Sequence, residues 1–411
     1  MKTIPVSGMV ITDKDKETMI YAISSGEISY GSYNRLASDR LATYDKLNFC
    51  HLVNSGSSAN LLAMMAFTSK NMPKEYRVKK GDEIITVAAS FPTTVAPIIQ
   101  AGCVPVFVDI DDSYNIDVGQ IYKAITPKTK GIFIAHTLGI PFDVVEIENI
   151  CRKLGLFLIA DNCDSLGTTC NNKPISVWGD VITHSFYPAH HITSGEGGAV
   201  LTNNIRIAKI IQSMRDWGRD CQCEPGHDNY CGHRFEGQYG ELPANYDHKY
   251  VYSELGYNLK MTNIQAALLY SQLDNIVEWT EIRKSNFAIL DEYLHEYSFP
   301  YILKDGIYTD YSPSYKGIPS WFGYPICLPT RMNRSRVIEE LNKQGVQTRL
   351  LFAGNILKQP MWRYKHRTIG DLPMTNRIME QMFWIGCWHG LSEEDMLYSR
   401  DVVFNAIKEE E

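Results

Sequence analysis

Three cysteines lie close together in a polar, turn-rich segment of the chain. Cys221, Cys223 and Cys231 stand among Gly, Asp, Asn and His residues, where apolar packing does not explain a cysteine. Thiolates that converge in this way bind a metal ion or an iron–sulfur cluster. Local spacing leaves the fourth ligand open, and zinc with His227 or His233 is as compatible with it as an iron–sulfur cluster.

Two further segments carry groups suited to binding an anion or a heterocyclic ring. Gly56 and Ser57 precede a helical pattern, and the free N–H groups of a helix start favour an anion, although a serine there is also an ordinary cap. Asp161 directly follows the apolar run Leu158–Ala160. An acidic group at such a strand end is suited to hold a proton on a pyridine nitrogen, and equally to cap a helix.

A pair of histidines follows another predicted strand. His190 and His191 precede the glycine-rich run Gly195–Gly198, and both come shortly after the apolar segment Val181–Phe186. A single histidine is more often structural. Either imidazole of this pair is nevertheless suited to transfer a proton near neutral pH.

These residues need a scaffold, and the apolar pattern predicts an α/β fold. Strand patterns such as Glu83–Ala88 and Val104–Val108 alternate with helical patterns such as Val144–Leu154, which indicates a mostly parallel sheet. In such a fold, functional groups gather at the carboxyl ends of the strands. Later segments predict strands at Ser320–Leu328 and Val346–Leu351. The expected divisions are an arm over 1–30, a large domain over 31–261 with a cysteine-bearing loop over 219–249, one interdomain helix over 262–297, and a smaller α+β domain over 298–411.

The composition excludes several classes of protein. The 411 residues are 44% hydrophobic and 21% charged, which is typical of a globular chain. A net charge of −7 without a basic stripe argues against nucleic-acid binding. The chain contains no apolar run of the ~20 residues that a membrane span needs. Its first residues do not resemble a secretory signal, so we expect a cytoplasmic protein.

Taken together, the segments resemble the sugar aminotransferases of pyridoxal-phosphate fold type I (aspartate aminotransferase-like), the DegT/DnrJ/EryC1/StrS family. The family pattern Ser-Phe-x-x-x-Lys-x-x-x-x-Gly-Glu-Gly-Gly is matched at Ser185, Phe186 and Gly195–Gly198, but His190 replaces the lysine. An aminotransferase uses that lysine to form a Schiff base and to move the proton. Histidine does not form the Schiff base. The resemblance therefore implies non-covalently bound pyridoxamine 5'-phosphate, and dehydration with His190 as the base.

Within the family, the segment Phe186–His191 resembles the nucleotide-sugar 3-dehydrases, above all those that act on a CDP-linked 4-keto-6-deoxyglucose and carry a [2Fe-2S] cluster. Their four cysteines are separated by 57, one and seven residues, and Cys163, Cys221, Cys223 and Cys231 reproduce these gaps. The resemblance implies that these four hold the cluster. It also implies an NADH-dependent flavin and iron–sulfur reductase as partner, and a role in making 3,6-dideoxyhexoses for surface polysaccharide such as O-antigen.

The resemblance also implies the remaining contacts. Asn258 would reach the cofactor phosphate of a neighbouring subunit, which implies a homodimer with shared sites. His191 and Arg349 are candidate contacts of the nucleotide-sugar substrate. His191 is also compatible with assisting His190 or orienting it, and Arg349 is equally compatible with a structural role as a solvated strand-end residue. The role of Lys260 stays open. The implied cofactor contacts within the chain are Gly56, Ser57 and Ser185 at the phosphate, Asp161 at the pyridine nitrogen, Asp164 near the ring hydroxyl, and Phe91 stacked on the ring.

Two other functions are compatible with the missing lysine. One is a cluster-free 3-dehydratase whose cofactor is regenerated by glutamate; such a protein would be colourless and free of iron. The other is a catalytically inactive scaffold. The retained Asp161, Ser57 and Ser185 argue against a scaffold, because an inactive pocket has no need of cofactor contacts.

Overall fold

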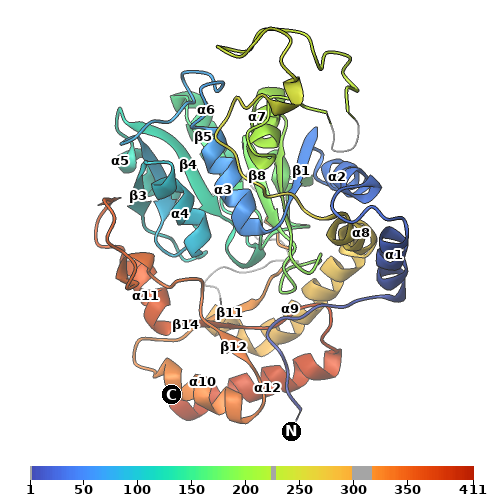
Figure 1. Ribbon diagram of the computed structural model, residues 1–411. Helices are drawn as coiled ribbons and strands as arrows, with labels where there is room; N and C mark the ends of the chain where they lie inside the picture. Colours follow the sequence, from blue (N-terminus) through green and yellow to red (C-terminus); the bar gives the residue numbers. More distant parts are fainter. Residues whose placement is uncertain (1, 224–227, 299–316) are drawn as a thin grey trace.

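The computed structural model describes residues 2–223, 228–298 and 317–411, and its centre is an eight-stranded sheet (Figure 1). The strand order is β1-β9-β8-β5-β4-β2-β3-β13. From β8 to β13 in this order all neighbours are parallel, whereas β9 is antiparallel to both β1 and β8. The predicted α/β fold with a mostly parallel sheet is therefore confirmed. The strands are β1(Phe49–Val53), β2(Glu83–Val87), β3(Val104–Val108), β4(Thr129–Ala135), β5(Phe157–Asp161), β8(Val181–Ser185), β9(Gly198–Thr202) and β13(Arg367–Thr368).

Both faces of the large sheet are buried under helices. Successive side chains of a strand point to opposite faces, and on β5 Phe157 and Ile159 join one apolar cluster while Leu158 and Ala160 join another. Strands covered on both sides are apolar throughout, which explains why the sequence shows them as continuous runs. The first cluster packs against α3(Gly56–Ala66), α4(Pro92–Gln100) and α7(Ile205–Arg215), and the second against α2(Ser32–Asp45), α5(Val118–Ala124) and α6(Val144–Leu154).

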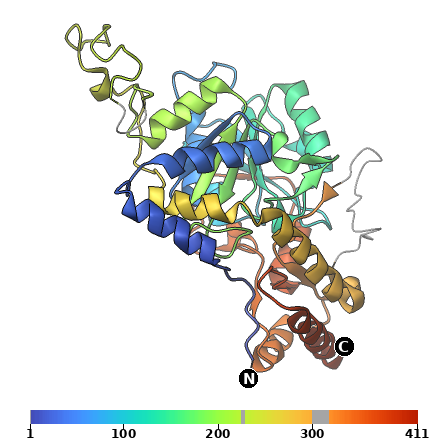
Figure 2. The same ribbon diagram turned by 90° about the vertical axis from the view of Figure 1, so that its right-hand side faces the viewer.

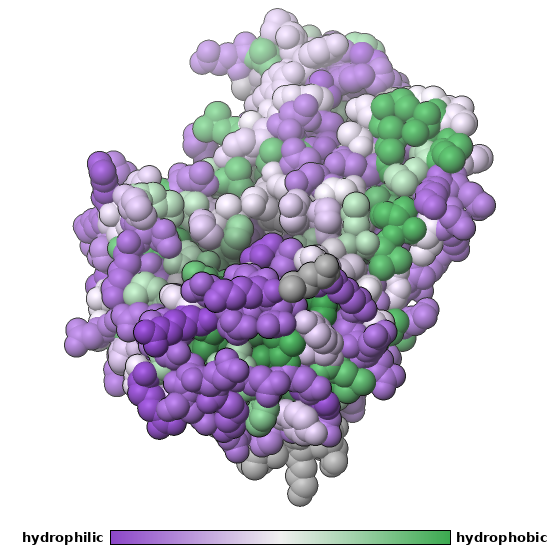
Figure 3. All heavy atoms as spheres, turned by 90° about the horizontal axis from the view of Figure 1, so that it is seen from below, coloured by the Kyte–Doolittle hydropathy of each residue, from purple (hydrophilic) through white to green (hydrophobic). Residues whose placement is uncertain are grey.

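A second, three-stranded sheet lies in the C-terminal part of the chain. Its order is β11-β14-β12, with antiparallel pairs, so β14 is the central strand. The predicted strands at Ser320–Leu328 and Val346–Leu351 are present but shorter, and the sequence analysis did not identify β14. Figure 3 shows the end of the molecule at which α10 and α12 lie, where most side chains are hydrophilic. The elements are β11(Tyr324–Cys327), β12(Thr348–Arg349), β14(Met382–Ile385), α10(Arg334–Lys343), α11(Pro373–Gln381) and α12(Glu393–Glu410).

The N-terminal and C-terminal parts of the chain are interleaved. β13 adds to the edge of the large sheet beside β3, and Ile4 near the N-terminus bridges Val346 beside the second sheet. A third small sheet joins β10(Gly317–Ile318) to β6(Thr169–Cys170) and β7(Lys173–Pro174). The expected arm over 1–30 contains α1(Asp13–Ser24). The predicted domain boundary at 298 stays a prediction, because residues 299–316 lie outside the described part.

The prediction of one long helix over 262–297 is wrong: the structure has α8(Asn263–Gln272) and α9(Ile276–Ser298). At the break, the N–H groups of Asp274 and Asn275 donate to carbonyls three residues back, at 3.0 and 3.1 Å. The carboxylate of Asp274 also binds Lys14 at 2.5 Å and Arg40 at 2.6 Å. These two cations come from α1 and α2, so a long-range ion-pair network forms at a break that the local pattern does not reveal.

The segment around the three clustered cysteines is a loop, as predicted. Its described residues contain one short helical turn, η3(His248–Tyr250), and the loop projects from the body of the molecule in two perpendicular views (Figures 1 and 2). Among the described residues, no helix is both long enough and apolar enough to cross a membrane.

Candidate active site

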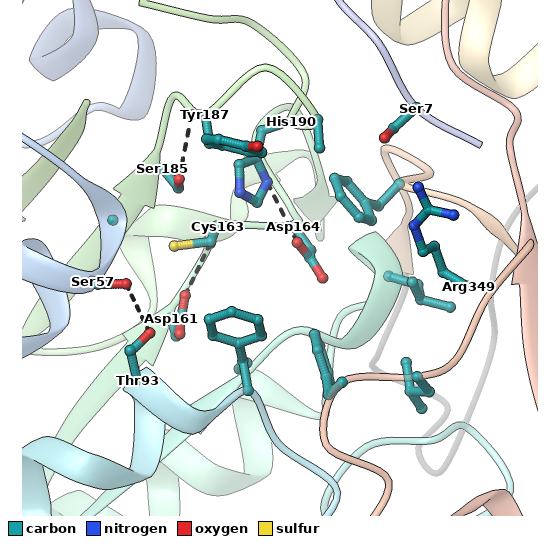
Figure 4. A pocket seen from close by; sticks show the side chains of 18 of the residues that line it. Ser7, Ser57, Thr93, Asp161, Cys163, Asp164, Ser185, Tyr187, His190 and Arg349 are labelled. Carbon is teal, nitrogen blue, oxygen red and sulfur yellow. Dashed lines mark hydrogen bonds and ion pairs between the residues drawn. The ribbon is translucent and has the colours of Figure 1, made fainter. Parts of the chain in front are cut away.

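A cavity of about 450 Å³ opens at the carboxyl ends of β4, β5 and β8, where the predicted site residues converge (Figure 4). The phosphate, ring and base positions expected from the sequence all line this one space. Its lining also includes Ser7 from the N-terminal segment and residues beside β12 and β14, so distant parts of the chain build it together. The predicted residues that line the cavity are Gly56, Ser57, Phe91, Asp161, Cys163, Asp164, Ser185, His190 and Arg349.

The start of α3 forms a cradle for an anion at one end of the cavity. Ser55 caps the helix by accepting a hydrogen bond from the N–H of Ser58 at 3.1 Å. The free N–H groups and the dipole of the first turn favour a phosphate. A Cβ atom at Gly56 would lie only 2.5 Å from the Cβ of Ser185, so a glycine is required for the helix start and Ser185 to meet. Ser57 donates to the Oγ1 of Thr93 at 3.0 Å, which adds a second hydroxyl at this end.

Asp161 ends β5 with its carboxylate held by three donors. Its Oδ2 accepts from Asn60 at 2.7 Å and from Thr94 at 2.8 Å, and its Oδ1 accepts from the N–H of Cys163 at 3.1 Å. Hydrogen bonds from three donors fix the orientation of the carboxylate. A buried carboxylate prepared in this way is suited to hold the proton of a pyridinium nitrogen.

The sequence analysis missed the residues that support Asp161. Asn60 lies on the first turns of α3, three residues past Ser57, and Thr94 lies three residues past Phe91 at the start of α4. Both residues stand three positions after a predicted site residue, and positions three apart lie on the same face of a helix. This spacing was the signal that could have identified Asn60 and Thr94. The spacing becomes informative only once the fold shows that the starts of α3 and α4 both face the end of β5.

His190 lies in the cavity beside Asp164, with its Nδ1 3.5 Å from the Asp164 Oδ1 (Figure 4). Burial, together with the positive charge of Arg283, lowers the pKa of His190 to about 3. Burial, together with the negative charge of Asp161, raises the pKa of Asp164 to about 8. At neutral pH the pair therefore consists of a neutral imidazole and a largely protonated carboxyl group. A neutral imidazole is the form that accepts a proton as a general base.

The remaining walls of the cavity are aromatic, with a guanidinium at the far side. Arg349 lies across the cavity from Ser57 (Figure 4), and its side chain donates to the carbonyl of Thr348 at 2.8 Å. Phe91 is about half exposed at 49%, which leaves one ring face open to a planar ligand. Only this ring was predicted; the other aromatic residues of the lining are Tyr187, Phe322, Phe352 and Trp384.

Two predicted contacts do not face this cavity. His191 is buried, and its Nε2 lies 2.9 Å from the carbonyl oxygen of Ser320, so its structural role applies in place of substrate contact. Asn258 is exposed and accepts from the Nζ of Lys260 at 2.8 Å. Lys260 also lies 3.5 Å over the ring of Trp217, a cation–π contact that gives the residue a structural partner.

The four predicted cluster ligands are not brought together. Cys221, Cys223 and Cys231 line a second, small cavity of about 40 Å³ with Trp217 and His248, whereas Cys163 lines the first cavity. Among the described residues, no group of three or more His, Cys, Asp or Glu side chains is placed to hold a metal ion. The arrangement therefore does not fit a four-cysteine cluster. Of the zinc alternatives, His233 instead contacts Glu236, and His227 lies outside the described residues.

The fold and the cavity define an enzyme of pyridoxal-phosphate fold type I, and comparison with known proteins gives its family. Residues 10–404 match the DegT/DnrJ/EryC1/StrS aminotransferase family, and the chain belongs to it.

Two relatives and one solved structure cover nearly the whole chain. The chain is 47% identical to the lipopolysaccharide biosynthesis protein RfbH of Salmonella typhimurium, covering 96% of this chain and 90% of that protein. It is 43% identical to the dTDP-4-dehydro-2,6-dideoxy-D-glucose 3-dehydratase of Saccharopolyspora spinosa, and the match covers 95% of this chain and 84% of that protein. A crystal structure of GDP-4-keto-6-deoxymannose-3-dehydratase with a trapped PLP-glutamate geminal diamine matches with a TM-score of 0.83 and 25% identity, covering 97% of this chain and all of that one.

The close packing around the phosphate cradle gives a first testable prediction. In Gly198→Ala the new Cβ would lie 2.4 Å from the carbonyl oxygen of Ser55, which must shift and displace the start of α3. We expect the affinity for pyridoxamine phosphate, measured by fluorescence titration, to fall about tenfold, because such overpacking costs about 1–3 kcal/mol.

Gly131→Ala is the matched control for this variant. Its Cβ would lie 2.3 Å from the ring of Phe157, a clash of similar severity at the opposite end of the sheet from the cradle. It should lower the melting temperature without changing cofactor affinity. Equal loss of affinity in both variants would contradict the assignment of the cradle.

Proposed function

We propose that this protein is a pyridoxamine-phosphate-dependent 3-dehydrase that removes the 3-hydroxyl group of a nucleotide-linked 4-keto-6-deoxyhexose. The observation that carries the proposal is the position of His190, which replaces the family's lysine and lines the cavity beside Asp161 and Asp164. A relative 43% identical is a nucleotide-sugar 3-dehydratase by name, which supports the same reaction class.

The residues of the cavity fit this cofactor, and each group of residues has a separate role in binding it or in moving a proton. Bound pyridoxamine phosphate supplies an amine that condenses with the keto group of the sugar and a ring that withdraws electrons. The start of α3, with Ser57 and Ser185, would hold its phosphate, and Asp161 would hold the proton on its ring nitrogen. His190, neutral because it is buried, would take the proton from the methylene carbon of the cofactor. Asp164 keeps its own proton beside His190 and adds no second negative charge to the buried site.

The substrate is inferred to be a CDP-sugar, as in CDP-4-keto-6-deoxy-D-glucose 3-dehydrase. Overall similarity to that enzyme supports this choice, and dTDP- or GDP-linked sugars, on which relatives act by name, are the alternatives. Arg349 would contact the substrate from the wall opposite the phosphate cradle, since a guanidinium is suited to the oxygens of a diphosphate. The role of RfbH in lipopolysaccharide biosynthesis supports a product used for surface polysaccharide.

The supply of electrons distinguishes two forms of this proposal. The first form is a [2Fe-2S] cluster reduced by an NADH-dependent flavin reductase, supported by the spacing of the four cysteines and by the three that line one cavity. Cys163, the fourth ligand that this form requires, lines the other cavity. The second form is a cluster-free 3-dehydratase whose cofactor regains its amino group from glutamate. The separation of Cys163, and a related structure with a trapped PLP-glutamate geminal diamine, favour this alternative.

We also infer a homodimer in which Asn258 completes the neighbouring site. Asn258 is exposed on its own subunit and lies outside its own cavity, two residues before Lys260, which bridges Val53 at the end of β1. The N-terminal helix α1 exposes Ile20 and Ile23 by 62% and 53%, and apolar surface of this kind is typical of a subunit contact.

The proposed base can be tested by restoring the family's lysine. His190→Lys should attach pyridoxal phosphate covalently, giving an absorbance band that survives dialysis and is fixed by borohydride. It should also lose dehydration at least about 100-fold, the size of a general-base contribution. His190→Asn should lose dehydration equally but attach no cofactor. Turnover that is unchanged in both variants would exclude His190 as the base.

Metal and sulfide analysis with a visible spectrum, on anaerobically purified protein, decides between the two electron sources. The cluster predicts two irons and two sulfides per chain and a red-brown colour that dithionite bleaches. Cys223→Ser should then lose iron but keep pyridoxamine phosphate, while Cys103→Ser, a buried cysteine outside both cavities, should keep both. Iron-free, colourless protein that turns over with glutamate would establish the alternative.

A further inference from the structure

Arg283 is a buried arginine that the mechanism above does not use. It lies on α9, and none of its surface is exposed. Its Nη2 donates to the carbonyl oxygen of His190 at 3.2 Å, and its Nη1 donates to those of Trp321 at 3.1 Å and Phe322 at 3.5 Å. Removing a cation from water costs several kcal/mol, so a fully buried arginine held by carbonyl groups requires a compensating role.

The side chain of His190 is held directly by one hydrogen bond, to the backbone of Cys163. Its Nδ1 is 3.5 Å from Asp164, longer than a good hydrogen bond, and its ring lies beside Phe322 with 5.2 Å between the centroids. The backbone N–H of His190 donates to Tyr187 in a tight turn. The direction of the imidazole therefore depends on this hydrogen bond and on where the backbone of the turn and the ring of Phe322 are placed.

Arg283 connects these two supports. One arm of its guanidinium binds the turn that carries His190, and the other binds the segment that carries Phe322. His191 joins the same two segments a second time, through the carbonyl oxygen of Ser320 at 2.9 Å. A planar guanidinium with five donors can bind two segments at once, whereas the charge and donors of a lysine ammonium are concentrated on one nitrogen atom.

We propose that Arg283 is a positioning residue that aims His190 at the cofactor by clamping the 187–191 turn to the 320–322 segment. This proposal rests on the proposed function only in taking residue 190 as the group that reaches the reactive carbon of the cofactor. It predicts that loss of Arg283 misdirects residue 190 while leaving the phosphate cradle and Asp161 intact.

The test uses His190→Lys as the parent, because covalent attachment of pyridoxal phosphate reports where residue 190 points without any substrate. Arg283→Met in this parent should slow attachment about 10- to 100-fold, since a misplacement of about 1 Å has effects of that size. The affinity for non-covalently bound pyridoxal phosphate, measured after a short mixing time, should stay within about twofold of the parent. Arg283→Lys should give an intermediate rate, and it also serves if the methionine variant does not fold.

Asn286→Ala is the matched control. Asn286 lies one turn further along α9 and is only 4% exposed. It also donates to carbonyl oxygens, including that of Trp388 at 3.1 Å, but it does not contact the His190 turn. It should lower the melting temperature and leave the attachment rate unchanged. The proposal would be overturned if Arg283→Met left the attachment rate unchanged, or if Asn286→Ala lowered that rate as much as Arg283→Met. It would also be overturned if the His190→Lys parent attached no cofactor.

The natural His190 protein gives a second readout. There, Arg283→Met should lower kcat about 10- to 100-fold with KM unchanged, because substrate binding does not depend on the direction of the base. A loss confined to KM would overturn the positioning role. If the attachment rates behave as expected but the natural protein shows no dehydration, the proposed function fails while the positioning role stands.

Discussion

A cofactor without a covalent link must be held in register by non-covalent contacts alone, and this requirement organises the cavity. An internal Schiff base would place the reactive carbon and the base together by a bond. In the proposed site the phosphate end would be held by the start of α3 against Ser185, and the ring end by a carboxylate with three donors. The base is a separate group that must be both neutral and correctly aimed. Burial provides the first property, and the packing behind His190 provides the second.

The pair of His190 and Asp164 shows how burial, reinforced by the nearby charges of Arg283 and Asp161, sets the protonation state of a proposed base and its neighbour. The same low-dielectric surroundings lower the pKa of the imidazole and raise that of the carboxyl group, because both shifts disfavour a charge. The two side chains therefore lie side by side without forming an ion pair. An ordinary surface His–Asp contact would do the opposite and favour the imidazolium, which is useless as a base.

The sequence predicted most strands of the large sheet and several polar groups of the cavity because both depend on local signals. Continuous apolar runs marked the buried strands. Ser57 and Asp161 were identified at the ends of such runs, and Ser185 and His190 by a motif with fixed spacing. The misses depend on long-range contacts. The break between α8 and α9 involves cations on α1 and α2, β14 is a strand only through its partners on either side, and Arg283 looks like any helical arginine until the folded chain surrounds it. The cysteine spacing matched a pattern exactly, yet equal spacing does not place Cys163 and the loop cysteines in one cavity.

The pairing of β13 with β3 has a consequence for how the molecule opens and how it can be divided. A strand from the C-terminal part closes the edge of the large sheet, so the two parts share a hydrogen-bonded ladder as well as the cavity. Swinging one part away from the other as a rigid body would break that ladder, and access to the cavity must then come from loops and side chains at its mouth. Cutting the chain near residue 298 would leave β3 as a bare edge strand, an unpaired template for aggregation.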